Sequence, residues 1–123
     1  MELNVNFNSV DKANPNYKRV ITPLKDDDSL KITITPLKNL EQAKYVSQSK
    51  DDDNDVVEKI LTKHVKHIDG LTINFADGKV DITKIDQLLD LPRNETVEKI
   101  LMTTFNEIMN VSSINEDEEK NLD

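Results

Sequence analysis

The stretch DVVEKILTKHVKHIDG, residues 55–70, carries the strongest periodic pattern in the chain. Its apolar residues recur at helical spacing, which predicts an amphipathic helix with one buried face. Gly70 follows them, and glycine commonly ends a helix because it tolerates the left-handed backbone conformation there. We therefore expect a helix from Asp55 to Ile68, with a buried face made of Val56, Val57, Ile60, Leu61, His64, Val65 and Ile68.

The two histidines of the chain, His64 and His67, lie three positions apart in this stretch. Such a pair can meet at one metal ion, but zinc sites use three or four ligands, and the chain has no cysteine. The acidic run at residues 51–55 begins like a calcium loop, yet Val56 and Thr62 stand where that loop needs Gly and Glu. We expect packed or surface histidines, no metal and no cofactor.

The chain after residue 70 predicts a hairpin and two helices. Apolar residues alternate on both sides of Asp77-Gly78, which is a tight-turn signal, so residues 71–82 predict a small hairpin. A Leu-rich segment that ends at Pro92 predicts a short helix, and Asn94 is expected to cap a last long helix. That helix repeats the VEKIL of residues 57–61 at residues 97–101. Two copies are too few for a solenoid, so we expect both helices to pack in one core.

The chain before residue 55 predicts strands and one helix. Apolar residues alternate at residues 3–7, and two β-rich runs, 17–24 and 30–37, flank a polar loop. The runs predict an antiparallel hairpin, with residues 3–7 as a possible third strand. A helix is expected over residues 37–49, with Asn39 as its N-cap and with Leu37, Leu40, Ala43 or Lys44, and Val46 near its inner face.

These elements together predict an α+β fold: an N-terminal antiparallel hairpin or three-stranded sheet, then three or four helices with a small inserted hairpin. One domain is expected over residues 1–110, β-rich to residue 36 and mostly helical from residue 37, followed by a flexible acidic tail at residues 111–123. The expected core consists of Ile32, Ile34, Leu40, Val57, Ile60, Leu61, Val65, Ile68, Leu88, Leu89, Val97, Ile100, Leu101, Phe105 and Ile108.

Charge separates the expected tail from the rest of the chain. The 123 residues carry 16 Lys and Arg against 24 Asp and Glu, a net charge of −8, and residues 111–123 hold five acids and one lysine, or half of that total. The tail is either a solvated end or a docking segment that orders on a partner. In the second case the interacting residues are Ile114, Glu116, Asp117, Glu118, Glu119 and Leu122.

Several classes of function are disfavoured by composition. Phosphate contacts need clustered Lys and Arg, so direct binding of nucleic acid is not expected from an acidic chain. No apolar run of membrane-spanning length and no signal peptide are present, so no membrane association is expected. With two glycines and no cysteine the chain lacks a phosphate loop, a Gly-x-Ser-x-Gly turn and a thiol nucleophile, and we expect no enzymatic activity.

The layout resembles a family of small proteins from tailed bacteriophages. Its landmarks are the strand ITITPL at residues 32–37, Glu41 in the following helix, the segment DQLLDL at residues 86–91 and the tail SSINEDEEKN at residues 112–121. Over about residues 18–121 the chain is similar to tail assembly chaperones and to the baseplate hub assembly proteins of contractile-tailed phages. The resemblance implies an α+β protein with no catalytic residues.

The resemblance also implies a partner and a location. Such a chaperone binds a tape-measure or hub protein in the host cytoplasm during assembly, and its client surfaces would be the acidic tail, the groove between the long helices and the edge of the N-terminal hairpin. One alternative is a permanent structural subunit of the tail or baseplate, located in the virion. A second alternative is an acidic inhibitor that mimics DNA and binds a host protein. The oligomeric state is left open.

Overall fold

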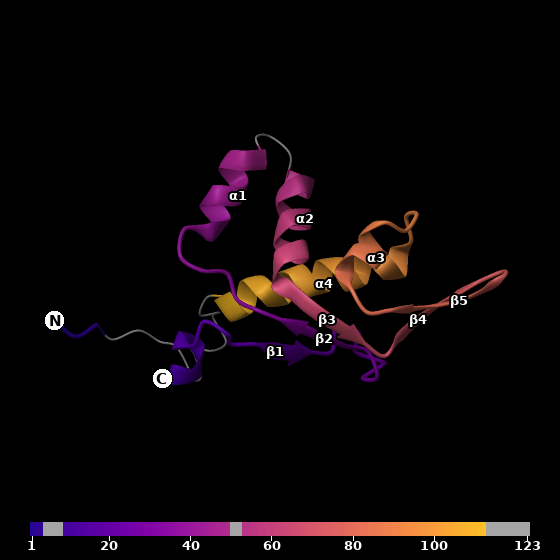
Figure 1. Ribbon diagram of the computed structural model, residues 1–123, viewed down its shortest axis with the longest axis horizontal. Helices are drawn as coiled ribbons and strands as arrows, with labels where there is room; N and C mark the ends of the chain where they lie inside the picture. Colours follow the sequence, from indigo (N-terminus) through magenta and orange to yellow (C-terminus); the bar gives the residue numbers. More distant parts are fainter. Residues whose placement is uncertain (4–8, 50–52, 113–123) are drawn as a thin grey trace.

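The computed structural model describes residues 1–3, 9–49 and 53–112, and its fold is α+β, as predicted (Figure 1). An antiparallel sheet has the strand order β1-β2-β3, and a separate hairpin pairs β4 with β5. The strands are β1 (Arg19–Ile21), β2 (Lys31–Ile34), β3 (Val65–Asp69), β4 (Leu71–Phe75) and β5 (Gly78–Ile82). The helices in the described part are the 3-10 helix η1 (Val10–Ala13) and α1 (Glu41–Ser49), α2 (Asp53–His64), α3 (Ile85–Leu89) and α4 (Glu95–Ser112).

The three-stranded sheet confirms the predicted N-terminal hairpin and gives it a different third strand. Ile21 lies opposite Ile32 and Arg19 opposite Ile34 in the β1–β2 pair. The third strand is β3, which pairs with the other side of β2. Most of the alternating stretch at residues 3–7 lies outside the described residues.

The prediction that the helix continues to Ile68 is wrong. α2 ends at His64 and the chain passes directly into β3. The β-branched Val65 and Ile68 suit a strand, and both remain buried because they lie opposite Ile34 and Ile32 of β2. The register shifts by one residue between these two pairs, so Lys66 has no opposite residue on β2. This irregularity leaves Lys66 and the next residue, His67, exposed one after the other on β3.

The hairpin predicted at residues 71–82 is confirmed as β4 and β5. It extends from the body of the molecule at the end opposite the N-terminus (Figure 1). Gly70 forms the corner between β3 and β4 with a φ of 79°, and a Cβ placed there would overlap the backbone oxygen of Ser29. Glycine is therefore required at this corner by both the backbone conformation and the available space.

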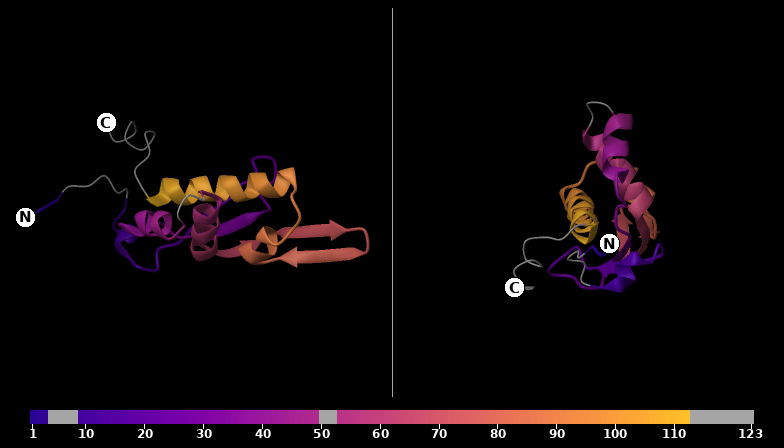
Figure 2. Two further views of the ribbon diagram at one scale, coloured as in Figure 1. Left: turned by 90° about the horizontal axis from the view of Figure 1, so that it is seen from above. Right: turned by 90° about the vertical axis from the view of Figure 1, so that its left-hand side faces the viewer.

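The core lies where the sheet meets α2, α3 and α4. α4 runs along the long axis of the molecule beside the strands, while α1 and α2 project away from the sheet and α2 meets β3 at its C-terminal end (Figures 1 and 2). α2 and α4 contact each other, as expected for the two VEKIL helices. Asn94 caps α4 as predicted, because its Oδ1 accepts from the backbone N–H groups of Thr96 and Val97. The most deeply buried side chains are Leu30, Ile32, Ile34, Ile60, Leu61, Ile68, Leu88, Ile100, Thr104 and Ile108.

Five members of the expected core differ from the prediction. Val57, Leu89, Leu101 and Phe105 are only partly buried, although they pack against the core. Leu40 is wrong as a core residue, because 85% of its surface is exposed.

The predicted start and inner face of α1 are also wrong. The helix begins at Glu41, not near Asn39, and it buries Glu41, Tyr45 and Ser49. A polar face turns inward because Glu41 finds hydrogen-bond donors there, whereas Val46 is exposed.

α4 continues through Val111, which is buried, and Ser112, the first two residues of the expected tail. Within the described ranges, none of the helices has the length and apolar character needed to cross a membrane.

Candidate functional site

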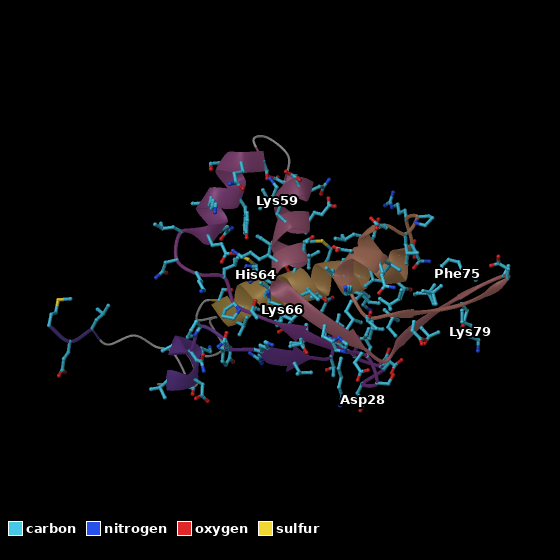
Figure 3. All side chains as sticks on the ribbon, viewed as in Figure 1. Asp28, Lys59, His64, Lys66, Phe75 and Lys79 are labelled. Atoms are coloured by element: carbon cyan, nitrogen blue, oxygen red, sulfur yellow. The ribbon has the colours of Figure 1, made fainter. Side chains whose placement is uncertain are left out.

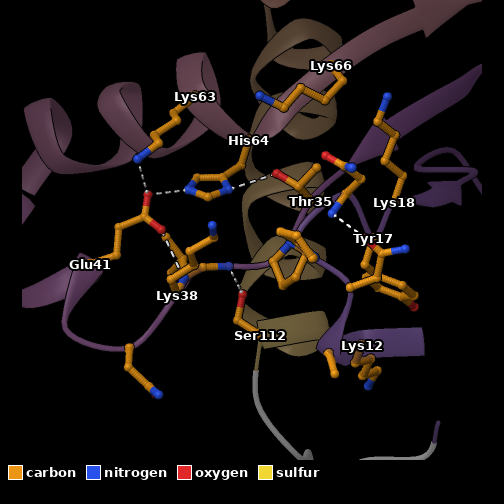
Figure 4. Close-up of a pocket in the computed structure, with 17 residues that line it drawn as sticks. Lys12, Tyr17, Lys18, Thr35, Lys38, Glu41, Lys63, His64, Lys66 and Ser112 are labelled. Carbon is orange, nitrogen blue, oxygen red and sulfur yellow. Dashed lines mark hydrogen bonds and ion pairs between the residues drawn. The ribbon is translucent and has the colours of Figure 1, made fainter. Parts of the chain in front are cut away.

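A pocket of about 740 Å³ lies at the end of the molecule opposite the β4–β5 hairpin. Five segments of the chain meet around it: η1, the approach to β1, the loop before α1, the α2–β3 junction and the end of α4. Each of the first four contributes lysine, and the fifth contributes Ser112 (Figure 4). We call this site the lysine pocket, after its lining residues Lys12, Lys18, Lys38, Lys63 and Lys66.

The charge of the lysine pocket is opposite to that of the chain. Among its described lining residues, five lysines face a single carboxylate, Glu41, which gives a net of +4 if His64 is neutral. The whole chain carries −8. Clustered cations at a concave surface attract anions, so the chemistry that this pocket can perform is the binding of carboxylate or phosphate groups.

Glu41 forms the inner wall of the pocket through an unusually complete set of hydrogen bonds. Its Oε1 accepts from the backbone N–H of Lys38 at 2.9 Å. Its Oε2 accepts from the Tyr45 hydroxyl at 2.8 Å, from Nε2 of His64 at 2.6 Å and from Nζ of Lys63 at 3.1 Å. Burial raises the pKa of Glu41, but the hydrogen bonds from Lys38, Tyr45, His64 and Lys63 outweigh it and lower the pKa to about 2. The hydrogen bond to Glu41 raises the pKa of Lys63 in turn.

His64 connects Glu41 to the sheet. Glu41 is a carboxylate that can only accept, so Nε2 of His64 carries a proton, and Nδ1 lies 2.9 Å from Oγ1 of Thr35. The backbone N–H of Thr35 also donates to the carbonyl of His64 at 2.9 Å. The imidazole is buried, as the apolar-face position of His64 predicted, whereas His67 is exposed. These bonds hold the end of α2 against the end of β2.

The order hydroxyl, imidazole, carboxylate in Thr35, His64 and Glu41 is also the order found in serine hydrolases. Such enzymes also place hydrogen-bond donors, from the backbone or from side chains, around an oxyanion near the nucleophile. Here Pro36 has no N–H, and the N–H groups of Leu37 and Lys38 already donate to Oγ of Ser112 and Oε1 of Glu41. The hydrogen bonds of Thr35, His64 and Glu41 join the end of β2, the end of α2 and the start of α1.

The residues predicted to interact with a partner all lie beyond Ser112, outside the described residues: Ile114, Glu116, Asp117, Glu118, Glu119 and Leu122. Ser112 itself lines the lysine pocket, and its Oγ accepts from the N–H of Leu37 at 2.6 Å. The chain therefore leaves the described structure at the rim of the pocket. No group of three or more His, Asp or Glu residues in the described ranges is arranged to hold a metal ion.

Sequence reasoning missed the lysine pocket for a physical reason. Its lysines extend from Lys12 to Lys66, and only Lys63 and Lys66 lie close together in the sequence, so no long basic run marks a binding site. Glu41 was noticed only as a helix residue of the family layout. The available local signals were Tyr45, one helical turn after Glu41, and the position of His64 on an apolar face.

Comparison with known proteins adds no family assignment. No protein-family model matches the sequence, and neither a curated protein nor a solved structure shows significant similarity to the chain.

Proposed function

We propose that this protein is a non-enzymatic bacteriophage tail or baseplate assembly protein, a chaperone that binds a tape-measure or hub protein in the host cytoplasm. The phage context rests on the resemblance over residues 18–121. The protein-binding activity is supported by one structural observation, the apolar face of the β4–β5 hairpin, which is uncovered toward the turn. The acidic net charge fits a client with a basic or apolar surface.

The hairpin has one apolar and one polar face. The pairing of Leu71 with Ile82 and of Ile73 with Val80 places these four side chains and Phe75 on one face. The other face carries polar side chains, among them Thr72, whose hydroxyl donates to Asp81 at 2.8 Å. Such alternation is typical of a strand pair that packs on one side only.

The rest of the protein packs against the apolar face only near the base of the hairpin. Ile82 is buried and Leu71 is partly buried at the base, where α3 contacts β5. Toward the turn, 44% of Phe75 and 42% of Val80 remain exposed. Figure 3 shows Phe75 near the free end of the hairpin, far from His64 and Lys66. An isolated two-stranded hairpin is marginally stable in water, so a partner that covers this face would also stabilise the hairpin.

Capture from infected cells tests the proposal. Tagged wild-type protein is compared with the double variant Phe75→Ser/Val80→Thr and with a control, Asn74→Ser, on the polar face of the same hairpin. We expect the wild type and the control to capture a tape-measure or hub protein, identified by mass spectrometry, and the double variant to lose it.

Purified mature particles separate the proposal from its alternatives. Absence from the particles together with client capture supports the chaperone. Presence at a fixed ratio to other tail proteins would make the protein a structural subunit and overturn the chaperone role. Capture of a host nucleic-acid-binding protein alone would favour the DNA-mimic alternative and overturn the assembly function.

A further inference from the structure

We propose that the lysine pocket is the docking site for the acidic segment that follows α4 in the same chain, residues 113–123. The segment follows directly after Ser112, which lines the pocket, carries a charge opposite to that of the pocket and is long enough to reach the lysines. This inference does not depend on the phage assignment, since it concerns two parts of one molecule.

The position of Ser112 supplies the first argument. Its Oγ accepts from the N–H of Leu37 at 2.6 Å and donates to the carbonyl of Ile108 at 2.5 Å, so the end of α4 is fixed to the wall of the pocket. Glu116 follows four residues later and Glu119 seven residues later. An extended chain spans about 3.3–3.6 Å per residue, which gives a reach of about 13–14 Å for Glu116 and about 23–25 Å for Glu119. The acids therefore leave the helix within reach of the lysines.

Charge supplies the second argument. Residues 113–123 contain five acids and Lys120, a net of −4, and the described lining of the pocket carries five lysines against Glu41, a net of +4 with His64 neutral. Glu41 already accepts from four donors, and Lys63 is its ion-pair partner. The four lysines Lys12, Lys18, Lys38 and Lys66 thus remain to face the four consecutive acids at residues 116–119.

Tethering supplies the third argument. One exposed ion pair contributes little, but several pairs on a short tether act together at a high effective concentration. Four consecutive acids also repel one another, and lysines placed between them relieve that repulsion. The docked segment would fill the pocket and exclude other anionic ligands from it until it is displaced.

Paramagnetic relaxation enhancement tests the docking directly. The chain has no cysteine, so Asn121→Cys places a single spin label in the acidic segment, and Lys79→Cys on the distal hairpin provides the control label. We expect the label at residue 121, but not the label at residue 79, to broaden the amide signals of Lys18, Lys38 and Lys66. The broadening should disappear when Glu116, Asp117, Glu118 and Glu119 are changed to Gln or Asn, and it should weaken strongly at about 0.5 M salt.

A peptide titration measures the contribution of the pocket. A synthetic peptide of residues 113–123 is titrated into the chain whose four acids have been neutralised. Lys18→Gln/Lys66→Gln should weaken its binding about fivefold, and Lys79→Gln/Lys99→Gln, away from the pocket, should leave it unchanged. Lys18 and Lys66 are exposed, so we expect the double variant to fold, and its circular dichroism spectrum checks this.

Two outcomes would overturn the proposal. In the first, the pocket amides are not broadened by the label at residue 121. In the second, chains that carry the spin label at natural nitrogen abundance are mixed with ¹⁵N-enriched chains that carry no spin label. Broadening of the pocket amides in this mixture, as strong as in singly labelled ¹⁵N chains, would show that the segment docks on a second copy.

Discussion

The lysine pocket and the β4–β5 hairpin lie at opposite ends of the molecule. The buried polar groups of the pocket wall have their partners within the chain, whereas apolar side chains of the hairpin remain exposed. At the pocket, the buried Glu41 accepts from four donors of its own chain, and its interactions are completed internally. At the hairpin, the backbone is paired along the ladder but Phe75 and Val80 have no full cover. The difference teaches that changes at the inner wall of the pocket should alter folding, whereas changes at the hairpin tip should alter binding.

Of the changes at the pocket and at the hairpin, Glu41→Gln should have the largest effect on stability. Glutamine keeps one acceptor oxygen and presents an NH₂ group to donors that need an acceptor, so we expect a loss of about 3 kcal/mol in the free energy of unfolding. Urea melts measure it. Glu58→Gln on the exposed face of α2 is the control and should stay within about 0.5 kcal/mol of wild type. Equal losses in both variants would contradict the assigned role of Glu41.

Acid should reversibly remove the contribution of the Glu41 carboxylate to the free energy of unfolding. The pKa of Glu41 is lowered from 4.5 to about 2 in the folded chain, so its stabilising effect is complete above about pH 5 and is lost as the pH falls toward 2. The shift corresponds to roughly 3 kcal/mol. The difference in unfolding free energy between wild type and Glu41→Gln should therefore shrink across this pH range. A constant difference between pH 5 and pH 2.5 would show that the carboxylate charge is unimportant.

The hairpin offers a matched pair of glycines, Gly70 at the corner where β4 begins and Gly78 at the turn between β4 and β5. Gly70→Ala should cost about 2 kcal/mol, because the residue has a positive φ and its Cβ would overlap the Ser29 carbonyl. Gly78→Ala, at the hairpin turn, meets no atom within 4 Å and should change stability by less than about 0.5 kcal/mol. Thermal or urea melts compare the two. A larger loss at Gly78 would reverse this assignment.

The hairpin tip should give the smallest effect on stability. Phe75→Ser should lower the free energy of unfolding by less than about 1 kcal/mol, because 44% of the surface of Phe75 is already exposed. Leu61→Ala, fully buried on α2, is the contrasting change and should cost about 2–5 kcal/mol in the same melts. Similar losses in the two variants would mean that the tip packs against the body and is unavailable to a partner.

Local sequence patterns predicted the two hairpins, the short helix α3 and α4, because each pattern agrees with the long-range contacts of its segment. They failed at Val65–Asp69 because Ile60, Leu61, His64, Val65 and Ile68 fit a helical face equally well. Pairing of Ile68 with Ile32 across the sheet decides between helix and strand, and that contact is not local. The repeated VEKIL shows the same limit, since Leu61 is buried in α2 while Leu101 is only partly buried in α4.

The candidate site was less predictable than the fold. Hydrophobic patterning assigns apolar residues to the core and polar residues to the surface. It therefore predicts a buried Leu40 and an exposed Glu41, the reverse of what is found. Two of the four donors to Glu41 come from the nearby Lys38 and Tyr45, but the other two come from Lys63 and His64, on another helix. A buried carboxylate with distant donors leaves little trace in a single sequence.

The direct passage from α2 into β3 has a kinetic consequence. Strands β1 and β2 are joined by residues 22–30, whereas β2 and β3 are joined by residues 35–64, which include α1 and α2. The second connection has 30 residues and the first has nine. If both connections are flexible in the unfolded chain, closing the longer one costs about 1 kcal/mol more in free energy, because more conformational entropy is lost. Because no residue separates α2 from β3, formation of α2 fixes where β3 starts. Formation of the α1–α2 pair shortens the flexible chain between β2 and β3. The rate at which this chain folds should therefore depend on how early α1 and α2 form.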